Sequence, residues 1–413
     1  MKKLLVISPQ NPYPAKDGGK ISIYYPLIHL TETFEVHFAF FTLKEVTWET
    51  YDHFTLHNVR LYPLIKNTTD QALGYILNIA SALPYKFQKY TSRKILKRLD
   101  GICQKEGITT VWCNHAHVAW YGLQLNKSRG VNIFLREHNI EYSLVKQVMH
   151  VLQNPFIKAF VWYQFIKTRK FEIRCWKMFR TTFFISDSDF ALAQKSNINN
   201  KCVLLYDSTA ASPVAAGAIK NQPVSQVDKE PYSFIFTANI DSFQNYYNLK
   251  KFIFDIWKPL IAKDNRWKLY ITGNERQFLE TKLKSNLDEN NIICLGIVND
   301  IQEVVSSKKY FISPTYIGSG LRIKVLNALA QGEVCFVTLI DLMMLKNLRD
   351  EDNIVQYDGF DSFYYKLLLL ENNTELYNKI SLGAKLVGTS FSWSNYVDII
   401  YNEISKVEGF TGR

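Results

Sequence analysis

The sequence predicts an α/β protein made of two doubly wound domains that face a central cleft. The chain has 413 residues, more than one hydrophobic core of ordinary size accommodates. Short apolar runs alternate with helix-like segments, a pattern typical of parallel sheets covered by helices on both faces. Small and polar residues with three prolines interrupt this alternation at 208–231, which predicts a linker over 209–230 between the two domains.

The first domain is expected over residues 1–208. The apolar run at 4–7 leads into a loop with two prolines and the pair Gly18 and Gly19, and a helix is expected at 21–30. This order of strand, glycine turn and helix opens a doubly wound domain. Further strands are expected at 36–42, 109–113, 131–135 and 182–186.

The second domain is expected over residues 231–392. Gly273 and Gly296 each close an apolar run, as expected for turns at strand ends. Strands are expected at 233–237, 267–272, 292–295 and 310–313, and helices at 249–261 and from 275. The last helix, 393–407, has apolar residues at helical spacing and could pack back onto the first domain or across the second.

Composition narrows the class of protein. The 49 Lys and Arg outnumber the 38 Asp and Glu, for a formal charge of +11, which favours an anionic partner such as nucleic acid, acidic lipid or a phosphorylated small molecule. The six cysteines are widely spaced, as expected for isolated thiols in a reducing compartment. No segment has the roughly 18 apolar residues of a membrane span, so the sequence predicts a cytoplasmic protein.

The segment 313–332 reads SPTYIGSGLRIKVLNALAQG, the end of a strand, a turn with two glycines, and a helix. With Ser319 as N-cap, the amides of the first turn from Gly320 would lack intrahelical partners and would form an anion site. Gly318 and Gly320 would let a phosphate approach the backbone. The alternative is an ordinary tight turn with no ligand.

Two cations and an amide follow the glycines on the expected helix. The guanidinium of Arg322 offers a fork of donors for phosphate oxygens, and Lys324 adds a point charge. Asn327 lies one turn further along the same helical face and could bind a sugar hydroxyl. These side chains fit a diphosphate, although solvated surface cations remain the alternative.

The segment resembles glycosyltransferase family 4, the retaining nucleotide-sugar transferases of GT-B fold, which often read P-x-x-x-G-x-G-x-x-K-V-L-E-A-M-A-x-G. Other segments resemble the family in the same order. They are the N-terminal PYP…GG loop, LREHNIEYSLVKQ, FFISDSDFALAQ, YITGNE and LGIVNDIQEVVSS. The resemblance covers the chain from its start to about residue 394 and is weakest at 200–231.

The resemblance implies a donor site mainly in the second domain. The amides from Gly318 through Ser319 and Gly320 to Leu321 would bind the diphosphate with Arg322 and Lys324. The remaining donor residues implied are Asn327 at the family's ribose-binding glutamate, Ile297 and Val298 against the base, Gly273, and Gly18, Gly19 and Lys20 from the first domain. Arg322, Lys324 and His138, which matches a family histidine near the donor sugar, would be catalytic.

The family's chemistry needs neither a metal nor a cofactor, because helix amides and cations can stabilise the departing nucleotide diphosphate. His115 and His117 resemble a metal pair, but no third ligand is apparent, and a non-metal role is expected. Many relatives carry glutamates at the positions of Ser319 and Asn327. This departure motivates one alternative, a catalytically silent transferase-like binding protein. A nucleotide-sugar epimerase of the same fold is the other.

Two basic stretches rich in aromatics lie in the first domain, the acceptor-binding half of the family. Residues 146–180 carry eight Lys or Arg and one acid, and residues 86–98 carry six and none. Such helices could rest on the anionic inner face of a membrane and reach a lipid-linked acceptor. The alternative is a packed aromatic stripe with a solvated basic face. Nucleic acid is not expected, because no nucleic-acid-binding module accompanies the charge.

Overall fold

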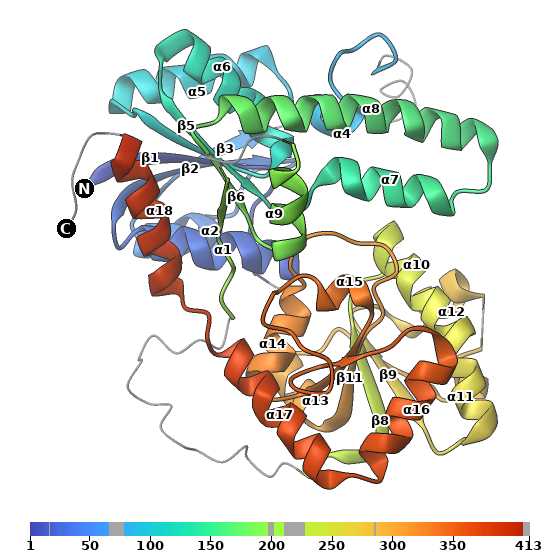
Figure 1. The fold of residues 1–413 in the computed structure, drawn as a ribbon. Helices are drawn as coiled ribbons and strands as arrows, with labels where there is room; N and C mark the ends of the chain where they lie inside the picture. The colour runs from blue at the N-terminus through green and yellow to red at the C-terminus, as the bar shows by residue number, and fades with distance from the viewer. Residues whose placement is uncertain (16, 66–77, 197–201, 210–227, 285, 408–413) are drawn as a thin grey trace. The chain divides into compact units, whose positions relative to one another are not determined.

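The computed structural model describes residues 1–413 apart from 16, 66–77, 197–201, 210–227, 285 and 408–413. The chain forms two compact units. The first comprises 1–207, 319–321 and 393–413, and the second comprises 208–318 and 322–392. Each unit contains one parallel sheet with helices (Figure 1), which confirms the prediction of two doubly wound α/β domains. Most of the expected linker lies outside the described residues, and the cleft stays a prediction.

The first unit is built on a seven-stranded sheet of order β3-β2-β1-β4-β5-β6-β7. All of its neighbouring strands pair in parallel. The strands are β1 (Lys2–Ser8), β2 (Phe34–Thr42), β3 (Val59–Ile65), β4 (Thr110–Asn114), β5 (Asn132–Glu137), β6 (Thr181–Phe184) and β7 (Cys202–Leu204). The direction of winding reverses between β1 and β4, where open sheets of this kind bind ligands.

Helices cover both faces of this sheet (Figure 1). They are α1 (Gly18–Leu30), α2 (Trp48–Leu56), α4 (Tyr85–Gln88), α5 (Arg93–Glu106), α6 (Ala119–Arg129), α7 (Glu141–Val151), α8 (Pro155–Met178), α9 (Asp187–Gln194) and α18 (Trp393–Val407), with a 3-10 turn η1 (Ala116–Val118). Helix α1 starts three residues before the predicted position because the Asp17 side chain accepts a hydrogen bond from the Lys20 amide and caps it.

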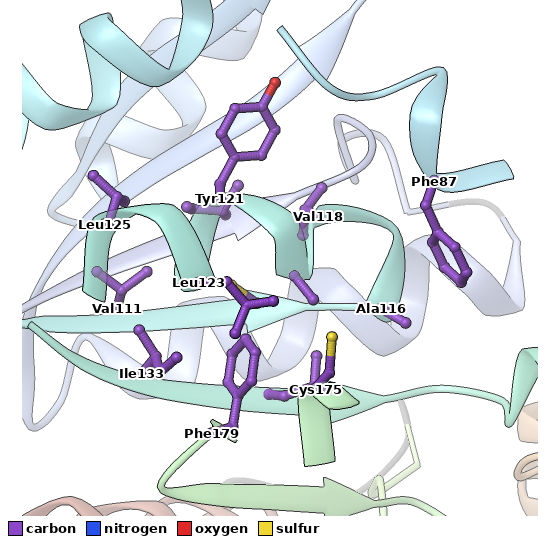
Figure 2. Close-up of a cluster of buried hydrophobic side chains, with 14 of the residues drawn as sticks. Phe87, Val111, Ala116, Val118, Tyr121, Leu123, Leu125, Ile133, Cys175 and Phe179 are labelled. Carbon is purple, nitrogen blue, oxygen red and sulfur yellow. The ribbon is translucent and has the colours of Figure 1, made fainter. Parts of the chain in front are cut away.

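Alternate residues of each strand supply two separate cores. On β1, Leu5 and Ile7 belong to a buried cluster shared with α5, α6 and α8, part of which is shown in Figure 2. Leu4 and Val6 point to the other face and pack with α1 and α18. Because both faces are covered, the strands read as nearly continuous apolar runs, which is why the sequence revealed most of them.

The second unit contains a six-stranded parallel sheet of order β10-β9-β8-β11-β12-β13. The strands are β8 (Glu230–Thr237), β9 (Lys268–Thr272), β10 (Ile292–Gly296), β11 (Lys308–Ser313), β12 (Val334–Val337) and β13 (Val355–Gln356). Its winding reverses between β8 and β11. The carboxyl ends of these two strands therefore mark the place where a ligand is expected.

The helices of the second unit flank this sheet. They are α10 (Phe243–Phe252), a π-helical turn η3 (Ile253–Trp257), α11 (Lys258–Lys263), α12 (Arg276–Leu283), a 3-10 turn η4 (Asp288–Asn290), α13 (Ile301–Ser306), α14 (Ile323–Gln331), α15 (Leu339–Leu342), α16 (Gly359–Glu371) and α17 (Thr374–Gly388). Within the described residues, no helix combines the length and apolar character needed to cross a bilayer.

Candidate active site

A small hollow lies in the second unit at the reversal of its sheet. Strand β8 supplies Phe236 at its carboxyl end, helix α10 supplies polar amides, and the segment after β11 supplies the opposite wall. The lining residues are Phe236, Gln244, Asn245, Asn248, Pro314, Thr315, Ile317, Arg322 and Lys324. Two of these are the cations that the sequence singled out. The lining is therefore polar and positively charged, as an anionic ligand requires.

The wall after β11 is held by one buried amide side chain. Oδ1 of Asn248 accepts hydrogen bonds from the backbone amides of Tyr316 and Ile317, both at 3.0 Å. Its Nδ2 donates to the carbonyl oxygen of Ile317 at 3.0 Å. Because this side chain satisfies three backbone groups, it fixes the path of the chain toward Gly318.

Gly318 leaves room for the guanidinium of Arg322. A Cβ atom added at residue 318 would lie 1.6 Å from Nη2 of Arg322 and 2.7 Å from Cγ2 of Thr315. The glycine therefore serves close packing of the arginine in this structure.

The predicted helix start is wrong. Helix α14 begins at Ile323, and Arg322 rather than Ser319 is its N-cap, with no side-chain capping bond. Gly320 has φ of +78°, the left-handed region, which cannot continue a right-handed helix. The first-turn amides that lack intrahelical partners therefore come from Ile323 onward, next to Lys324.

The guanidinium of Arg322 faces a buried carboxylate. Its Nε lies 3.5 Å from Oδ1 of Asp341, whose side chain is 1% exposed. Oδ2 of the same carboxylate accepts hydrogen bonds from the hydroxyls of Ser313 and Thr315, both at 2.7 Å. Burial raises the pKa of Asp341, whereas the positive charge of Arg322 and the two hydroxyl hydrogen bonds oppose that rise.

The ammonium of Lys324 sits over an aromatic ring in the hollow. Its Nζ is 4.4 Å from the centroid of the Phe236 ring, a cation–π distance. Burial lowers the pKa of Lys324 from its ordinary 10.5 to about 8, while the carboxylate of Asp341 acts in the opposite direction. The site therefore carries a positive charge that costs free energy until an anion arrives.

Asn327 lies one turn along α14 from Lys324. Within the described part of the chain, its buried Oδ1 has no hydrogen-bond partner. An unpaired buried carbonyl oxygen is costly, and a ligand hydroxyl would relieve that cost.

The glycine segment divides between the units. Residues Ser319 to Leu321 belong to the first unit, where Oγ of Ser319 donates to the carboxylate of Asp189 at 2.8 Å and accepts from the amide of Ile140 at 3.1 Å. A Cβ on Gly320 would lie 2.0 Å from the carbonyl oxygen of His138. The Ser319 hydroxyl is therefore engaged by protein groups and does not cap α14.

His138 belongs to a buried polar network of the first unit. Nδ1 of His138 lies 3.2 Å from Oγ of Ser22, whose hydroxyl donates to Asp207. Nε2 lies 2.9 Å from Nη1 of Arg136 and 2.8 Å from Oδ1 of Asn114. Burial lowers the pKa of His138 well below its ordinary value, so the ring is neutral. Both ring nitrogens thus have protein partners, and the catalytic role of this histidine stays a prediction.

His115 and His117 follow β4. His115 has φ of +100°, an unusual backbone for a residue with a side chain, and its ring stacks on that of His138 with centroids 3.6 Å apart. His117 lies 3.9 Å from the carboxylate of Glu141. Within the described residues, no group of three or more His, Cys, Asp or Glu side chains is arranged to hold a metal ion.

The other predicted donor residues lie at the start of α1 in the first unit, where Lys20 follows the two glycines, and after strand ends in the second unit. Gly18 and Gly19 are exposed at the start of α1 in the first unit. In the second, Gly273 has φ of +105°, and a Cβ there would lie 2.6 Å from the carbonyl oxygen of Ala238, so its packing explains the glycine. Ile297, 81% exposed, and Val298 follow β10. Their contacts with a donor stay predictions.

Sequence reasoning missed several residues of the site, among them Phe236, Asn248 and Asp341. Each comes from an element far along the chain from Arg322. A weak signal existed for Asp341, which is the one charged residue of the mostly apolar segment TLIDLMML.

Three comparisons place this architecture among known proteins. Residues 231–370 match the family model "Glycosyl transferases group 1". The structure of Anabaena HepE in complex with UDP is similar with a TM-score of 0.65 and 10% identity, covering 98% of this chain and 100% of that one. Sucrose-phosphate synthase from Thermosynechococcus elongatus is similar with a TM-score of 0.71 and 12% identity, covering 99% and 100%.

One curated relative is similar over most of its sequence. It is an uncharacterized 44.6 kDa protein in the cps region of Klebsiella pneumoniae, 25% identical over 344 residues, or 80% of this chain and 81% of the relative. The two structural neighbours share the two-domain GT-B fold with this chain, which confirms the fold predicted from the sequence.

Proposed function

We propose that this chain, a glycosyltransferase of GT-B fold whose group 1 domain spans residues 231–370, moves a sugar from a nucleotide-diphosphate donor to a glycan or lipid-linked glycan acceptor. The observation that carries the proposal is the hollow of the second unit, where Arg322 and Lys324 meet at the reversal of the sheet. The UDP bound in the Anabaena structure supports a nucleoside diphosphate as the ligand.

In the proposed reaction, the second unit stabilises the leaving group. As the bond between sugar and diphosphate breaks, negative charge develops on the phosphate oxygens. The guanidinium of Arg322 and the ammonium of Lys324 would oppose that charge, with the first amides of α14 beside them. This chemistry calls for neither a metal nor another cofactor. The anomeric configuration would be retained, as in the family that the sequence resembles.

The donor's ribose would meet α14. Asn327 lies one helical turn beyond Lys324, and its unpaired Oδ1 would accept a hydrogen bond from a ribose hydroxyl. The base would lie against Ile297 and Val298, which follow β10 and include one largely exposed apolar side chain. Both contacts are part of the proposal.

The acceptor side is proposed to include a membrane surface. Helix α8 has a single acid, Glu172, which is buried. Its exposed cations are Lys158, Arg169, Lys170, Arg174 and Lys177. Near its start, Phe156 is 85% exposed and Trp162 is 52% exposed. An exposed helical surface with large apolar groups and only positive charge fits an anionic bilayer on the cytoplasmic side. This location would bring a lipid-linked glycan of polysaccharide biosynthesis within reach.

The test begins with a panel of UDP, GDP and ADP, measured by thermal stabilisation. At 100 times its Kd, the correct nucleotide should add about 2.7 kcal/mol, a rise of several degrees in Tm. Arg322→Ala and Lys324→Ala should remove most of this effect and nearly all turnover with the matching nucleotide sugar. Arg276→Ala and Lys268→Ala, which change exposed cations elsewhere in the second unit, serve as matched controls.

Product analysis completes the test. Transfer gives a glycosylated acceptor and free nucleoside diphosphate, whereas an epimerase would interconvert sugars without acceptor. Wild-type turnover in both Arg322→Ala and Lys324→Ala would refute the assignment of the leaving-group site.

A further inference from the structure

The carboxylate of Asp341 has an arrangement that a structural ion pair alone does not require. The hydroxyls of Ser313 and Thr315 both donate hydrogen bonds to the same carboxylate oxygen, Oδ2. The other oxygen, Oδ1, is buried and has no hydrogen-bond partner within the described residues. This oxygen forms an ion pair with Arg322, whose Nε lies 3.5 Å away.

The two hydroxyls make this carboxylate a rigid reference point. A carboxylate anchored at one oxygen by two donors has little freedom to rotate, so the position of Oδ1 is fixed relative to β11. The side chain comes from α15, and the neighbouring Thr338 donates from Oγ1 to the carbonyl oxygen of Thr315 at 2.5 Å. The segment after β12 thus holds the carboxylate itself and Thr338, which ties this segment to the backbone of Thr315, one of the two residues that anchor the carboxylate.

Arg322 is restrained from three directions. Its backbone amide donates to Sδ of Met344 at 3.4 Å, its guanidinium packs against Gly318, and its Nε faces Asp341. A long flexible side chain loses rotamer freedom when it binds an anion. Holding the guanidinium beforehand reduces that loss, because the fork is already oriented when the ligand arrives.

We propose that Asp341 is a positioning residue that orients the Arg322 guanidinium toward the diphosphate of the donor. The proposal rests on the proposed function for the identity of the ligand. Asp341 itself does not touch the donor, since its carboxylate is buried behind Thr315 and Arg322. Its negative charge would repel phosphate if exposed, so its burial behind the cation is part of the arrangement.

The first experiment compares Asp341→Asn with the wild type by titration calorimetry with UDP and with uridine. The asparagine keeps the shape of the side chain and the hydroxyl contacts but removes the negative charge. Affinity for UDP should fall about tenfold, as losses of supporting contacts behind a ligand-binding group do, while affinity for uridine stays unchanged. Equal losses for UDP and uridine, or no loss for either, would overturn the proposal. Ser313→Ala, which removes one anchor of Oδ2, should show a smaller loss confined to UDP.

A second measurement does not depend on any nucleotide. Phenylglyoxal modifies accessible guanidinium groups, and peptide mass spectrometry reads the rate at Arg322 directly. The rate in Asp341→Asn should rise several-fold, with the exposed Arg276 as internal reference. An unchanged rate would contradict the positioning role even if UDP binds. Conversely, if no nucleoside diphosphate binds the wild type, the proposed function fails, and the modification rates still decide the role of Asp341.

Discussion

The lowered pKa of Lys324 makes the affinity for a nucleoside diphosphate depend on pH in a defined way. With a pKa of about 8, about 90% of the side chains are charged at pH 7 and about 10% at pH 9. The terminal phosphate of a nucleoside diphosphate, with a pKa near about 6, stays ionised over this range. If only the charged lysine binds the diphosphate, the apparent Kd rises about tenfold between pH 7 and pH 9.

The assay is titration calorimetry with UDP at intervals from pH 6.5 to 9.5. In Lys324→Arg the cation stays protonated, so the affinity should vary little with pH. In Lys324→Met the cation is absent, and binding should be weak and equally flat. Other groups that titrate in this pH range, such as Glu333, whose pKa burial raises to about 7, are unchanged in both variants and cannot explain a difference between them.

Deprotonation of Lys324 does not lower the free energy of unfolding between pH 7 and pH 9. Between about pH 8 and 10.5 the unfolded chain holds a proton that the folded Lys324 has lost. The contribution of Lys324 to the free energy of unfolding therefore increases as the pH rises. Weaker binding at pH 9 accordingly reports the charge of the lysine rather than local unfolding. An affinity for UDP that is constant from pH 7 to 9 in the wild type, or that falls equally in Lys324→Arg, would refute the reasoning.

Three further outcomes are expected. Gly318→Ala should reduce the affinity for UDP at least tenfold, because the new Cβ displaces the guanidinium of Arg322. It should lower Tm modestly, because that Cβ also presses on Cγ2 of Thr315, although residue 318 does not have positive φ. Asn248→Ala should lower the free energy of unfolding by about 3 kcal/mol in urea, since three buried hydrogen bonds to backbone are lost. Phe156→Ala with Trp162→Ala should abolish sedimentation with vesicles that contain phosphatidylglycerol.

Matched controls distinguish these effects from general damage. Gly101, on α5, has open space where a Cβ would stand, so Gly101→Ala should leave UDP binding unchanged. Leu382→Ala with Leu386→Ala removes an equally exposed apolar pair from α17 and should leave vesicle binding intact. If the Leu382 and Leu386 substitutions reduce vesicle binding as much as the Phe156 and Trp162 substitutions do, the proposed membrane surface is wrong. If Asn248→Ala unfolds at the wild-type urea concentration, its hydrogen bonds do not hold the wall of the hollow.

The sequence predicted the helices and strands whose own residues show a clear apolar periodicity. The last helix, 393–407, has the predicted bounds because its buried side chains, among them Ile400 and Ile404, recur at helical spacing. Strands β3, β7, β12 and β13 were not predicted. Strands β7, β12 and β13 have three, four and two residues, so none presents enough alternation to be recognised, and each is defined by pairing with a neighbour. Strand β3 has seven residues, but it contains a proline and only two of its positions are buried.

In the candidate site too, residues within a local pattern were predicted, and residues that depend on distant contacts were not. The cations of the segment 313–332 were found because they follow a strand end with glycines, and strand ends are where open sheets bind ligands. The start of α14 was placed three residues too early, because Gly320 was taken for a helical residue and instead has positive φ. The contacts of Asn248 join residues at least 68 positions apart in the chain, and those of Asp341 join residues at least 19 positions apart. No local pattern encodes such contacts.

The central claim is that a diphosphate binds in the hollow of the second unit against Arg322 and Lys324. A crystal structure of the chain with the nucleotide that stabilises it most tests this claim directly. The account predicts phosphate oxygens within about 3.2 Å of the guanidinium or the ammonium, at the carboxyl ends of β8 and β11. A nucleotide bound elsewhere, with its phosphates away from both cations, would contradict it.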